Sequence, residues 1–254
     1  MKMNKLFLET SIQIKKIFGY KRDKILDFIK DKETVTSTYV LMEFNRRVIK
    51  DCIYLHSLLR EERYVGDVIR RVNELPKEWE RKRNICNLIL GSISDGGDLE
   101  NTERAAIKLK RFIDYQLKTH FLYGISTIIY ETNCDLAKED IIERNDKYFL
   151  NTTCKQAEMR CKIKNFIEDH KKEFEDILNG LKTESEFKKV CDVLEEVLNE
   201  PEKAMGKYCN KILGDCIISV EAPKDYKIFT TDHHYLAICR YIDRDTLLLN
   251  QLEF

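Results

Sequence analysis

The sequence predicts an α/β fold with a central parallel sheet, on three observations. Short apolar or β-branched runs alternate with helical patterns at both ends of the 254-residue chain, as in strands joined by right-handed helical crossovers. Only 3 Pro and 9 Gly interrupt the chain, which is too few for a loop-rich architecture. Acidic residues follow several predicted strands, and the carboxyl ends of parallel strands are where such sheets bind ligands.

The N-terminal segment is predicted to contain two strands, each followed by helical sequence. The strands are 3–8 and 33–37, and the helices are 12–18, 22–32 and 38–59. The last helix has apolar residues at helical spacing and Ser37 as its N-cap.

The end of the chain resumes the same alternation. It predicts a helix at 209–222, a strand at 227–230, a helix at 234–241 and a strand at 246–249. We therefore expect residues 1–47 and 208–254 to form one α/β core.

Residues 48–207 are predicted to be a mostly helical insertion that packs against this core. The segment is dense in Lys, Arg and Glu, with breaks at Pro76, 94–97, Gly124 and Pro201. Residues 125–130 have strand composition and could return to the sheet, although a helix fits them as well.

Composition narrows the class of protein. No apolar run is long enough for a membrane span and no signal-peptide pattern opens the chain, so we expect no membrane partner. The nine cysteines are odd in number and never spaced as CxxC, which indicates free thiols in a reducing cytoplasm. The net charge of zero hides 25 Lys/Arg against 18 Asp/Glu in residues 1–118, a basic half that suits nucleic acid or a solvated helical face.

Four acidic residues stand out, namely Glu9, Glu43, Asp215 and Asp232. Each follows or opens an apolar run that would place it at one end of the sheet. Each also has an ordinary explanation: Glu9 as a helix N-terminal acid, Glu43 as the i,i+4 partner of Arg47, and Asp215 and Asp232 as helix caps.

Taken together, the four neighbourhoods resemble the PIN-domain nucleases. Residues 8–12, Leu-Glu-Thr-Ser-Ile, are similar to the family's strand-ending Asp-Thr-Ser-hydrophobic motif, with Glu in place of Asp. Ser37 and Glu43 keep the family's spacing of six. The two remaining motifs are matched by Asp215, Ile217, Ile218 and Ala222, and by Thr230, Asp232 and Tyr235.

The resemblance implies a PIN-like three-layer fold and an endonuclease that hydrolyses phosphodiester bonds, in RNA that is single-stranded or structured. It implies Mg²⁺ or Mn²⁺ as cofactor, since hard cations take carboxylate ligands and activate water. Glu9, Asp215 and Asp232 would be metal ligands, and Glu43 a ligand or an anchor behind them. Ser11 and Thr230 would support them through hydrogen bonds.

One departure from the family bears on activity. Glu9 is a methylene longer than the family's Asp, and misplacing a group by about 1 Å can cost about 100-fold in rate. Two alternatives therefore stay open. One is a non-catalytic interaction protein on a PIN-like scaffold, and the other is the toxin nuclease of a toxin–antitoxin or antiviral system, held by an inhibitory protein partner or as a homo-oligomer.

Basic and aromatic residues give candidate nucleic-acid contacts. Arg46 and Arg47 follow Glu43, and Arg81 and Arg83 follow the single tryptophan, Trp79. Guanidinium groups bind phosphates and an indole stacks on bases, although a solvated helix surface and a core tryptophan explain them equally. His233 and His234, beside Asp232, could contact a phosphate or a softer metal, or simply occupy a turn.

Overall fold

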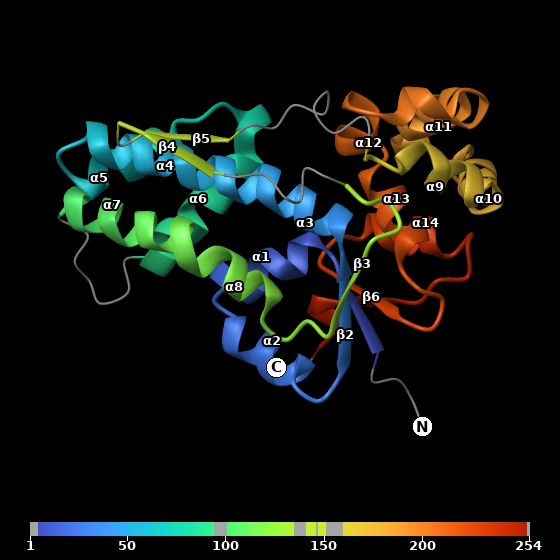
Figure 1. Ribbon diagram of the computed structural model, residues 1–254, viewed down its shortest axis with the longest axis horizontal. Coiled ribbons are helices and arrows are strands. Elements are labelled where there is room, and N and C mark those ends of the chain that lie inside the picture. Colours follow the sequence, from blue (N-terminus) through green and yellow to red (C-terminus); the bar gives the residue numbers. More distant parts are fainter. Residues whose placement is uncertain (1–4, 94–100, 135–140, 146, 151–159, 253–254) are drawn as a thin grey trace.

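A fully parallel five-stranded sheet forms the centre of the computed structural model, which describes residues 5–93, 101–134, 141–145, 147–150 and 160–252 (Figure 1). The strand order is β3-β2-β1-β6-β7. The bounds are β1 Lys5–Leu8, β2 Glu33–Ser37, β3 Thr127–Ile129, β6 Lys227–Thr230 and β7 Thr246–Leu248. A separate antiparallel pair consists of β4 (Ile141–Arg144) and β5 (Lys147–Leu150).

The α/β prediction with a central parallel sheet is confirmed. Strands 33–37 and 227–230 are found with the predicted bounds, and the segment 125–130 supplies β3, which pairs with β2. Of the predicted strand 3–8, residues 3 and 4 lie outside the described part of the chain.

The sheet is buried on both faces, which gives three layers. Phe7 of β1 faces the larger apolar core, whereas Leu6 and Leu8 face a second cluster with Ile12 and Ile25. Burial of both faces is the reason why the central strands β1 and β6 read as nearly continuous apolar runs.

The helices between the strands fall into two groups. The first group precedes β3 and contains α1 Thr10–Phe18, α2 Arg22–Ile29, α3 Thr38–Phe44, α4 Lys50–Glu61, α5 Val65–Asn73, α6 Glu80–Ile93, α7 Thr102–Arg111 and α8 Leu117–Leu122. The second group contains α9 Ile163–Asp169, α10 Lys171–Leu181, α11 Lys188–Asn199, α12 Lys207–Lys211, α13 Gly214–Glu221 and α14 His234–Cys239. Short 3₁₀ turns are η2 Lys77–Trp79, η6 Ser185–Phe187, η7 Pro201–Ala204 and η8 Leu249–Gln251.

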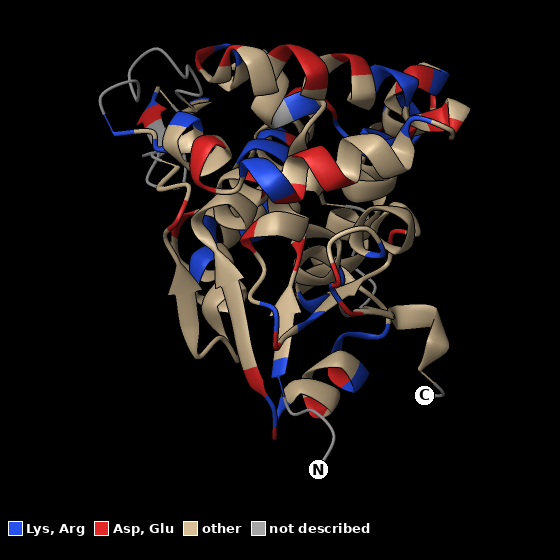
Figure 2. Ribbon diagram, turned by 90° about the vertical axis from the view of Figure 1, so that its right-hand side faces the viewer, with Lys and Arg blue, Asp and Glu red and all other residues tan. Residues whose placement is uncertain are grey.

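Apart from α2, which lies near the amino end of β2, the two helical groups lie on either side of the carboxyl ends of the strands (Figure 1). In the first group α6 and α8 contact α1, and in the second α10 and α12 contact α13. Figure 2 shows that charged residues are concentrated on these helices, while the strands are largely uncharged. The carboxyl ends of the strands therefore lie between helices that carry most of the charged residues.

Two predicted helices are interrupted. The predicted helix 38–59 contains a π-helical turn, η1 (Asn45–Ile49), and a second π turn, η3 (Phe112–Gln116), joins α7 to α8. The predicted helix 209–222 is two helices, because Ile212 and Leu213 turn the chain between α12 and α13. Apolar periodicity runs on through both interruptions, so the pattern alone does not reveal them.

Two further observations concern the expectations from composition. None of the eight cysteines in the described segments forms a disulfide. Over the same segments, no helix is both long and apolar enough to cross a membrane.

Candidate functional site

The candidate site lies where the order of the strands reverses. From β1 the chain moves outward to β2 and β3 on one side, and β6 and β7 extend the sheet on the other side. Glu9 follows β1 directly and Asp232 follows β6 by two residues. In open α/β sheets, ligands bind outside the carboxyl ends of the strands at such a reversal.

The four acidic residues that the sequence analysis singled out all raise the pKa of one buried tyrosine. Tyr235 of α14 has its hydroxyl 3.4 Å from the Asp215 carboxylate. Burial raises the pKa of Tyr235 well above its usual range, and the negative charges of Asp215, Glu9, Glu43 and Asp232 raise it further. Carboxylates that span most of the sequence thus share one neighbourhood.

Within this neighbourhood, Asp215, Asp232 and His234 form the tightest cluster. Each offers one ligand atom, and these atoms all lie within 4.8 Å of one another. His234 Nδ1 is 3.4 Å from Asp232 Oδ1 and 3.9 Å from Asp215 Oδ2. Adjacent ligands about 2.1 Å from a cation are about 3 to 3.4 Å apart, so small side-chain rotations would let all three bind one ion.

The position of each member follows from its local structure. Asp215 lies in the first turn of α13, after Gly214, so it is not the N-cap of that helix. The N-cap of α14 is His233, and Asp232 Oδ1, one residue before it, accepts a hydrogen bond at 2.9 Å from the backbone N–H of His234, the first residue of the helix. Thr230 Oγ1 accepts one from the Asp232 N–H at 2.9 Å, which fixes the loop after β6.

The electrostatics of the cluster favour a bound cation. Removal of water by the surrounding walls raises the pKa of Asp215 to about 6, and repulsion from Glu43 and Asp232 adds to the effect. Because 40% of the Asp215 side chain is exposed, water and ions still reach it. Neighbouring carboxylates that repel one another are stabilised when a positive charge joins them.

Glu9 has a different arrangement from the cluster. It is 3% exposed and is the N-cap of α1, where it accepts hydrogen bonds from Ser11 N at 2.7 Å and Ile12 N at 3.2 Å. The Ser11 hydroxyl also donates to Glu9 Oε1. Burial raises the pKa of Glu9 to about 7, against the opposing effect of the Ser11 hydrogen bonds.

These bonds commit Glu9 to the turn that follows β1. Ser11 Oγ in turn accepts hydrogen bonds from Thr231 N at 3.0 Å and Thr231 Oγ1 at 2.7 Å. The start of α1 is thereby joined to the loop that carries Asp232. Glu9 is outside the tightest cluster of potential ligand atoms, and its role as a metal ligand stays a prediction.

Glu43 is likewise held by close partners. It is buried, accepts a hydrogen bond from the Thr10 hydroxyl and forms an i,i+4 ion pair with Arg47. The ion pair suggested by the sequence spacing is thus present, and it places Glu43 between the acidic cluster and a basic cleft.

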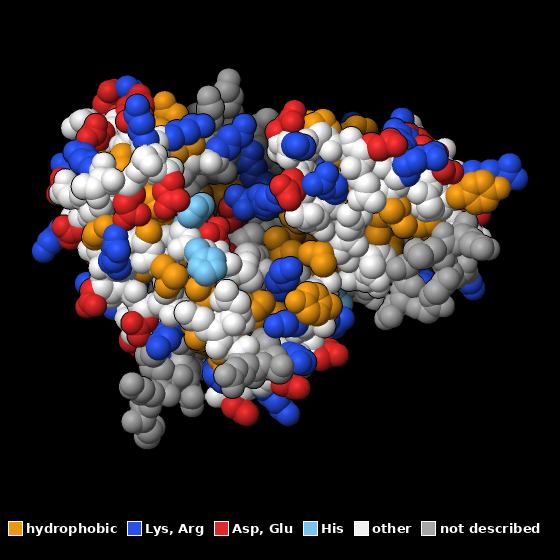
Figure 3. Space-filling view, turned by 180° about the vertical axis from the view of Figure 1, so that it is seen from behind, with side chains coloured by type: hydrophobic (Ala, Val, Ile, Leu, Met, Phe, Trp, Pro, Cys, Tyr) orange, Lys and Arg blue, Asp and Glu red, His pale blue; other side chains and the backbone are white. Residues whose placement is uncertain are grey.

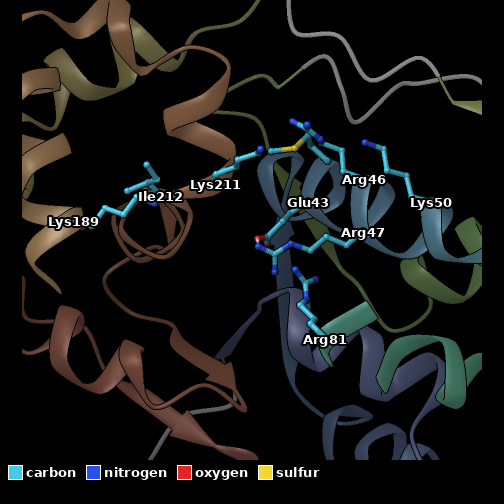
Figure 4. A pocket seen from close by; sticks show the side chains of 9 residues that line it. Glu43, Arg46, Arg47, Lys50, Arg81, Lys189, Lys211 and Ile212 are labelled. Carbon is cyan, nitrogen blue, oxygen red and sulfur yellow. Dashed lines mark ion pairs between the residues drawn. The ribbon is translucent and has the colours of Figure 1, made fainter. Parts of the chain in front are cut away.

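The basic cleft has a volume of about 490 Å³ and lies between the two helical groups (Figure 4). One wall carries Arg46 and Arg47 of η1, and α6 adds Arg81. A π-helical turn often marks a functional site, because it re-aims the side chains that it carries. Of the described residues in the lining, the remaining cations are Lys50, Lys189 and Lys211, and Glu43 is the single acid.

Figure 4 shows how these groups converge. Arg47 and Arg81 point toward Glu43, while Lys211 and Lys189 come from the opposite wall. Figure 3 shows the surface hollowed between the two helical groups, with Lys and Arg side chains gathered over the hollow. With six cations and one acid among its described lining residues, the cleft carries an excess of positive charge.

Two arginines need a closer description. Arg46 Nη1 is buried without a hydrogen-bond partner in the described part of the chain. Arg81 has an exposed surface, but the cleft walls displace water around it and, with Arg47, lower its pKa to about 10, so it remains a cation at neutral pH. Arg83, also proposed from the sequence, is not among the residues that line this cleft.

The sequence gives a weak signal for one residue of the site and none for two others. His234 stood beside Asp232 in the sequence, and its spacing could have suggested a third ligand. Lys189 and Lys211 come from the acidic half of the chain, so the overall charge pattern pointed away from them.

No family model, curated protein or solved structure matches the chain. The chemistry of the site therefore follows from its own residues and their geometry.

Proposed function

We propose that the protein is a PIN-like endonuclease that uses a divalent cation to hydrolyse phosphodiester bonds in RNA. One observation carries the proposal: a cluster of two carboxylates and an imidazole lies at the carboxyl edge of a parallel sheet, beside a cleft of six cations. The cleft binds the phosphates and the cluster provides the reactive centre. The choice of RNA over DNA follows the PIN-like resemblance, since the cleft itself suits either polyanion.

The ligand atoms fit a small divalent cation. Asp215 and Asp232 supply oxygens, which suit Mg²⁺ and Mn²⁺, and His234 supplies a nitrogen, which favours Mn²⁺ of the two. A cation held there would neutralise charge on the phosphoryl oxygens and lower the pKa of water.

The side chains around the cluster have supporting roles. The Tyr235 hydroxyl orients Asp215, and Glu9 with Ser11 fixes the two loops against each other. Arg47 and Arg81 are placed to bind the phosphodiester, because guanidinium groups match its oxygens. The cysteines of the described segments, all without disulfides, suit a reducing cytoplasm, which we include in the proposal.

A non-catalytic interaction protein on the same scaffold is the second candidate. The observation that favours it is the set of hydrogen bonds that satisfies Glu9, the residue in which the chain departs from the family's first Asp. In that case the cleft would bind a polyanion without cleaving it.

The decisive experiment is a cleavage assay on end-labelled single-stranded RNA. We expect internal cuts in Mn²⁺, weaker cutting in Mg²⁺ and none in EDTA, with loss of cutting in the double variant Asp215→Asn/Asp232→Asn. Binding without any cutting, in either metal, would favour the non-catalytic candidate. Undiminished cutting by the double variant would place the activity elsewhere.

A further inference from the structure

A second pocket opens on the other side of Arg81, with a volume of about 610 Å³. It is bounded by α1, the turn η2, α6 and the loop after β6. The parts from η2 and α6 belong to the helical insertion, which the PIN-like resemblance does not cover. Its size falls within the range of about 300 to 1,000 Å³ that is typical of small-molecule sites.

This pocket adjoins the candidate site in two ways, through a hydrogen-bonded pair of residues and through one arginine that it shares with the cleft. Ser11 and Thr231, which are hydrogen-bonded to each other, line it and join the loops that carry Glu9 and Asp232. Arg81 lines both this pocket and the basic cleft. An RNA strand whose phosphates lie in the cleft could therefore cross the acidic cluster and continue into the pocket.

The lining of the pocket differs in character from that of the cleft. Ile14, Ile85 and Leu88 form an apolar wall, and the amide of Asn84 stands beside it. An apolar wall suits the face of a nucleobase, and an amide both donates and accepts hydrogen bonds at a base edge.

The charges of the pocket are nearly balanced. Lys15, Lys77 and Arg81 are opposed by Glu78 and Glu80. The resulting excess of one positive charge suits a single phosphate group, whereas the six cations and one acid of the cleft suit a row of them.

We propose that this pocket binds one nucleotide of the substrate, with its base on the apolar wall and its phosphate toward Lys15 and Arg81. This inference rests on the proposed function and adds to it the place of the strand, from the basic cleft across Asp215 and Asp232 into the pocket. The nucleotide held there is the one that flanks the cleaved bond.

The single tryptophan provides a direct measurement. Trp79 is 48% exposed and belongs to η2, together with Lys77 and Glu78 of the pocket. Its fluorescence is titrated with adenosine 5′-monophosphate in EDTA, where no cleavage takes place, and equilibrium dialysis with labelled nucleotide provides a second reading. We expect saturable binding that inorganic phosphate alone does not reproduce.

Variants locate the bound nucleotide. Asn84→Ala and Lys15→Ala should each weaken binding by about tenfold, the effect of losing one good hydrogen bond to a charged or base-edge group. Lys118→Ala, an exposed lysine of α8 outside the pocket, is the control and should bind as the parent does. Equal affinity in all three variants would overturn the assignment, as would failure of both methods to detect binding at millimolar nucleotide.

The two proposals fail separately. Nucleotide binding that depends on Asn84, in a protein that never cuts RNA, would support the nucleotide pocket and contradict the nuclease activity. Mn²⁺-dependent cutting with no nucleotide binding would support the nuclease activity and contradict the nucleotide pocket. If both hold, Asn84→Ala should raise KM for short RNA with kcat nearly unchanged, because it removes binding common to ground and transition states.

Discussion

The guanidinium of Arg47 and the carboxylate of Glu43 form an ion pair at the junction of α3 and η1. Glu43 is buried, whereas 35% of the Arg47 side chain remains exposed toward the cleft. The pair thus holds a cation at the boundary between the acidic cluster and the basic cleft. From there Arg47 opposes the rise in the pKa of Asp215.

Replacement of Glu43 by Gln should release this arginine from its ion pair and raise the net charge of the cleft by one, because a carboxylate is lost. We expect tighter binding of single-stranded RNA in EDTA, and a salt dependence steeper by about 0.7 in log–log slope if one more phosphate is contacted. Cutting should slow, because Arg47 is no longer oriented. Glu61→Gln is the matched control, since it removes a partner of the exposed Arg71 outside the cleft. A shared effect in both variants would contradict the role of Glu43.

Loss of either aspartate should strongly weaken metal binding. Asp215→Asn and Asp232→Asn each delete a ligand charge at nearly constant volume, so we expect Mn²⁺ affinity to fall by more than about 100-fold, beyond the loss typical of a residue behind the ligands. Isothermal titration of Mn²⁺ measures this directly. Asp176→Asn, on the exposed face of α10, should leave the affinity unchanged. Parent-like Mn²⁺ binding by both site variants would remove the metal site.

Replacement of His234 should change metal preference. His234→Ala removes the only nitrogen ligand of the cluster, so Mn²⁺ binding should weaken more than Mg²⁺ binding and the ratio of the two affinities should fall. His233→Ala removes the adjacent exposed imidazole, which is outside the cluster. If the two variants shift the ratio equally, His234 does not bind the metal.

Variants of Glu9 test whether this residue acts as a helix cap or as a metal ligand. As a cap, Glu9→Ala should lower the free energy of unfolding by about 1 to 2 kcal/mol, with little change in Mn²⁺ affinity. Asn101→Ala removes the cap of α7 and should cost a similar free energy. Glu9→Asp shortens the acid by one methylene, and a tenfold change in Mn²⁺ affinity in that variant would make Glu9 a ligand after all.

Glu221 should make stability depend on pH. It is buried at the end of α13, accepts hydrogen bonds from Thr132 and has its pKa raised to about 7, mainly by burial. A raised pKa in the folded state means that the unfolded chain loses this proton first as pH rises. Stability should therefore fall between about pH 4.5 and pH 7, by about 3 kcal/mol for a shift from 4.5 to about 7.

Urea unfolding of the parent and of Glu221→Gln across this window checks the effect. The other buried carboxyls are the same in both proteins, so the difference between the two pH profiles isolates Glu221. Parallel profiles would show that Glu221 keeps an ordinary pKa in the folded state.

The sequence allowed the sheet to be predicted better than its helical surroundings. β2 and β6 were predicted with the observed bounds, because each is a short β-branched or apolar run with clear ends. The Glu43–Arg47 pair was also visible, since i,i+4 spacing is a local property of a helix. The π turn η1 could not be seen in the sequence, because the apolar spacing of residues 38–59 hardly changes across it.

The cleft could not be predicted for a different reason. Its walls come from η1, α6, α11 and α12, which are distant in sequence and meet only through tertiary packing. Lys189 and Lys211 have no local pattern that sets them apart from other surface lysines. Asp232 was found because it follows a strand, whereas His234 could be distinguished from His233 only once α13 brings Asp215 beside it.

The position of β1 in the sheet has a consequence for the folding of the protein during its synthesis. β1 pairs with β2, which is made soon after it, and with β6, which begins only at Lys227. A nascent chain exposes that edge of β1 until β6 has been synthesised, and such an edge invites misassembly. Asp232 follows β6 by two residues, so the acidic centre cannot assemble around Glu9 and Glu43 before that strand has been made.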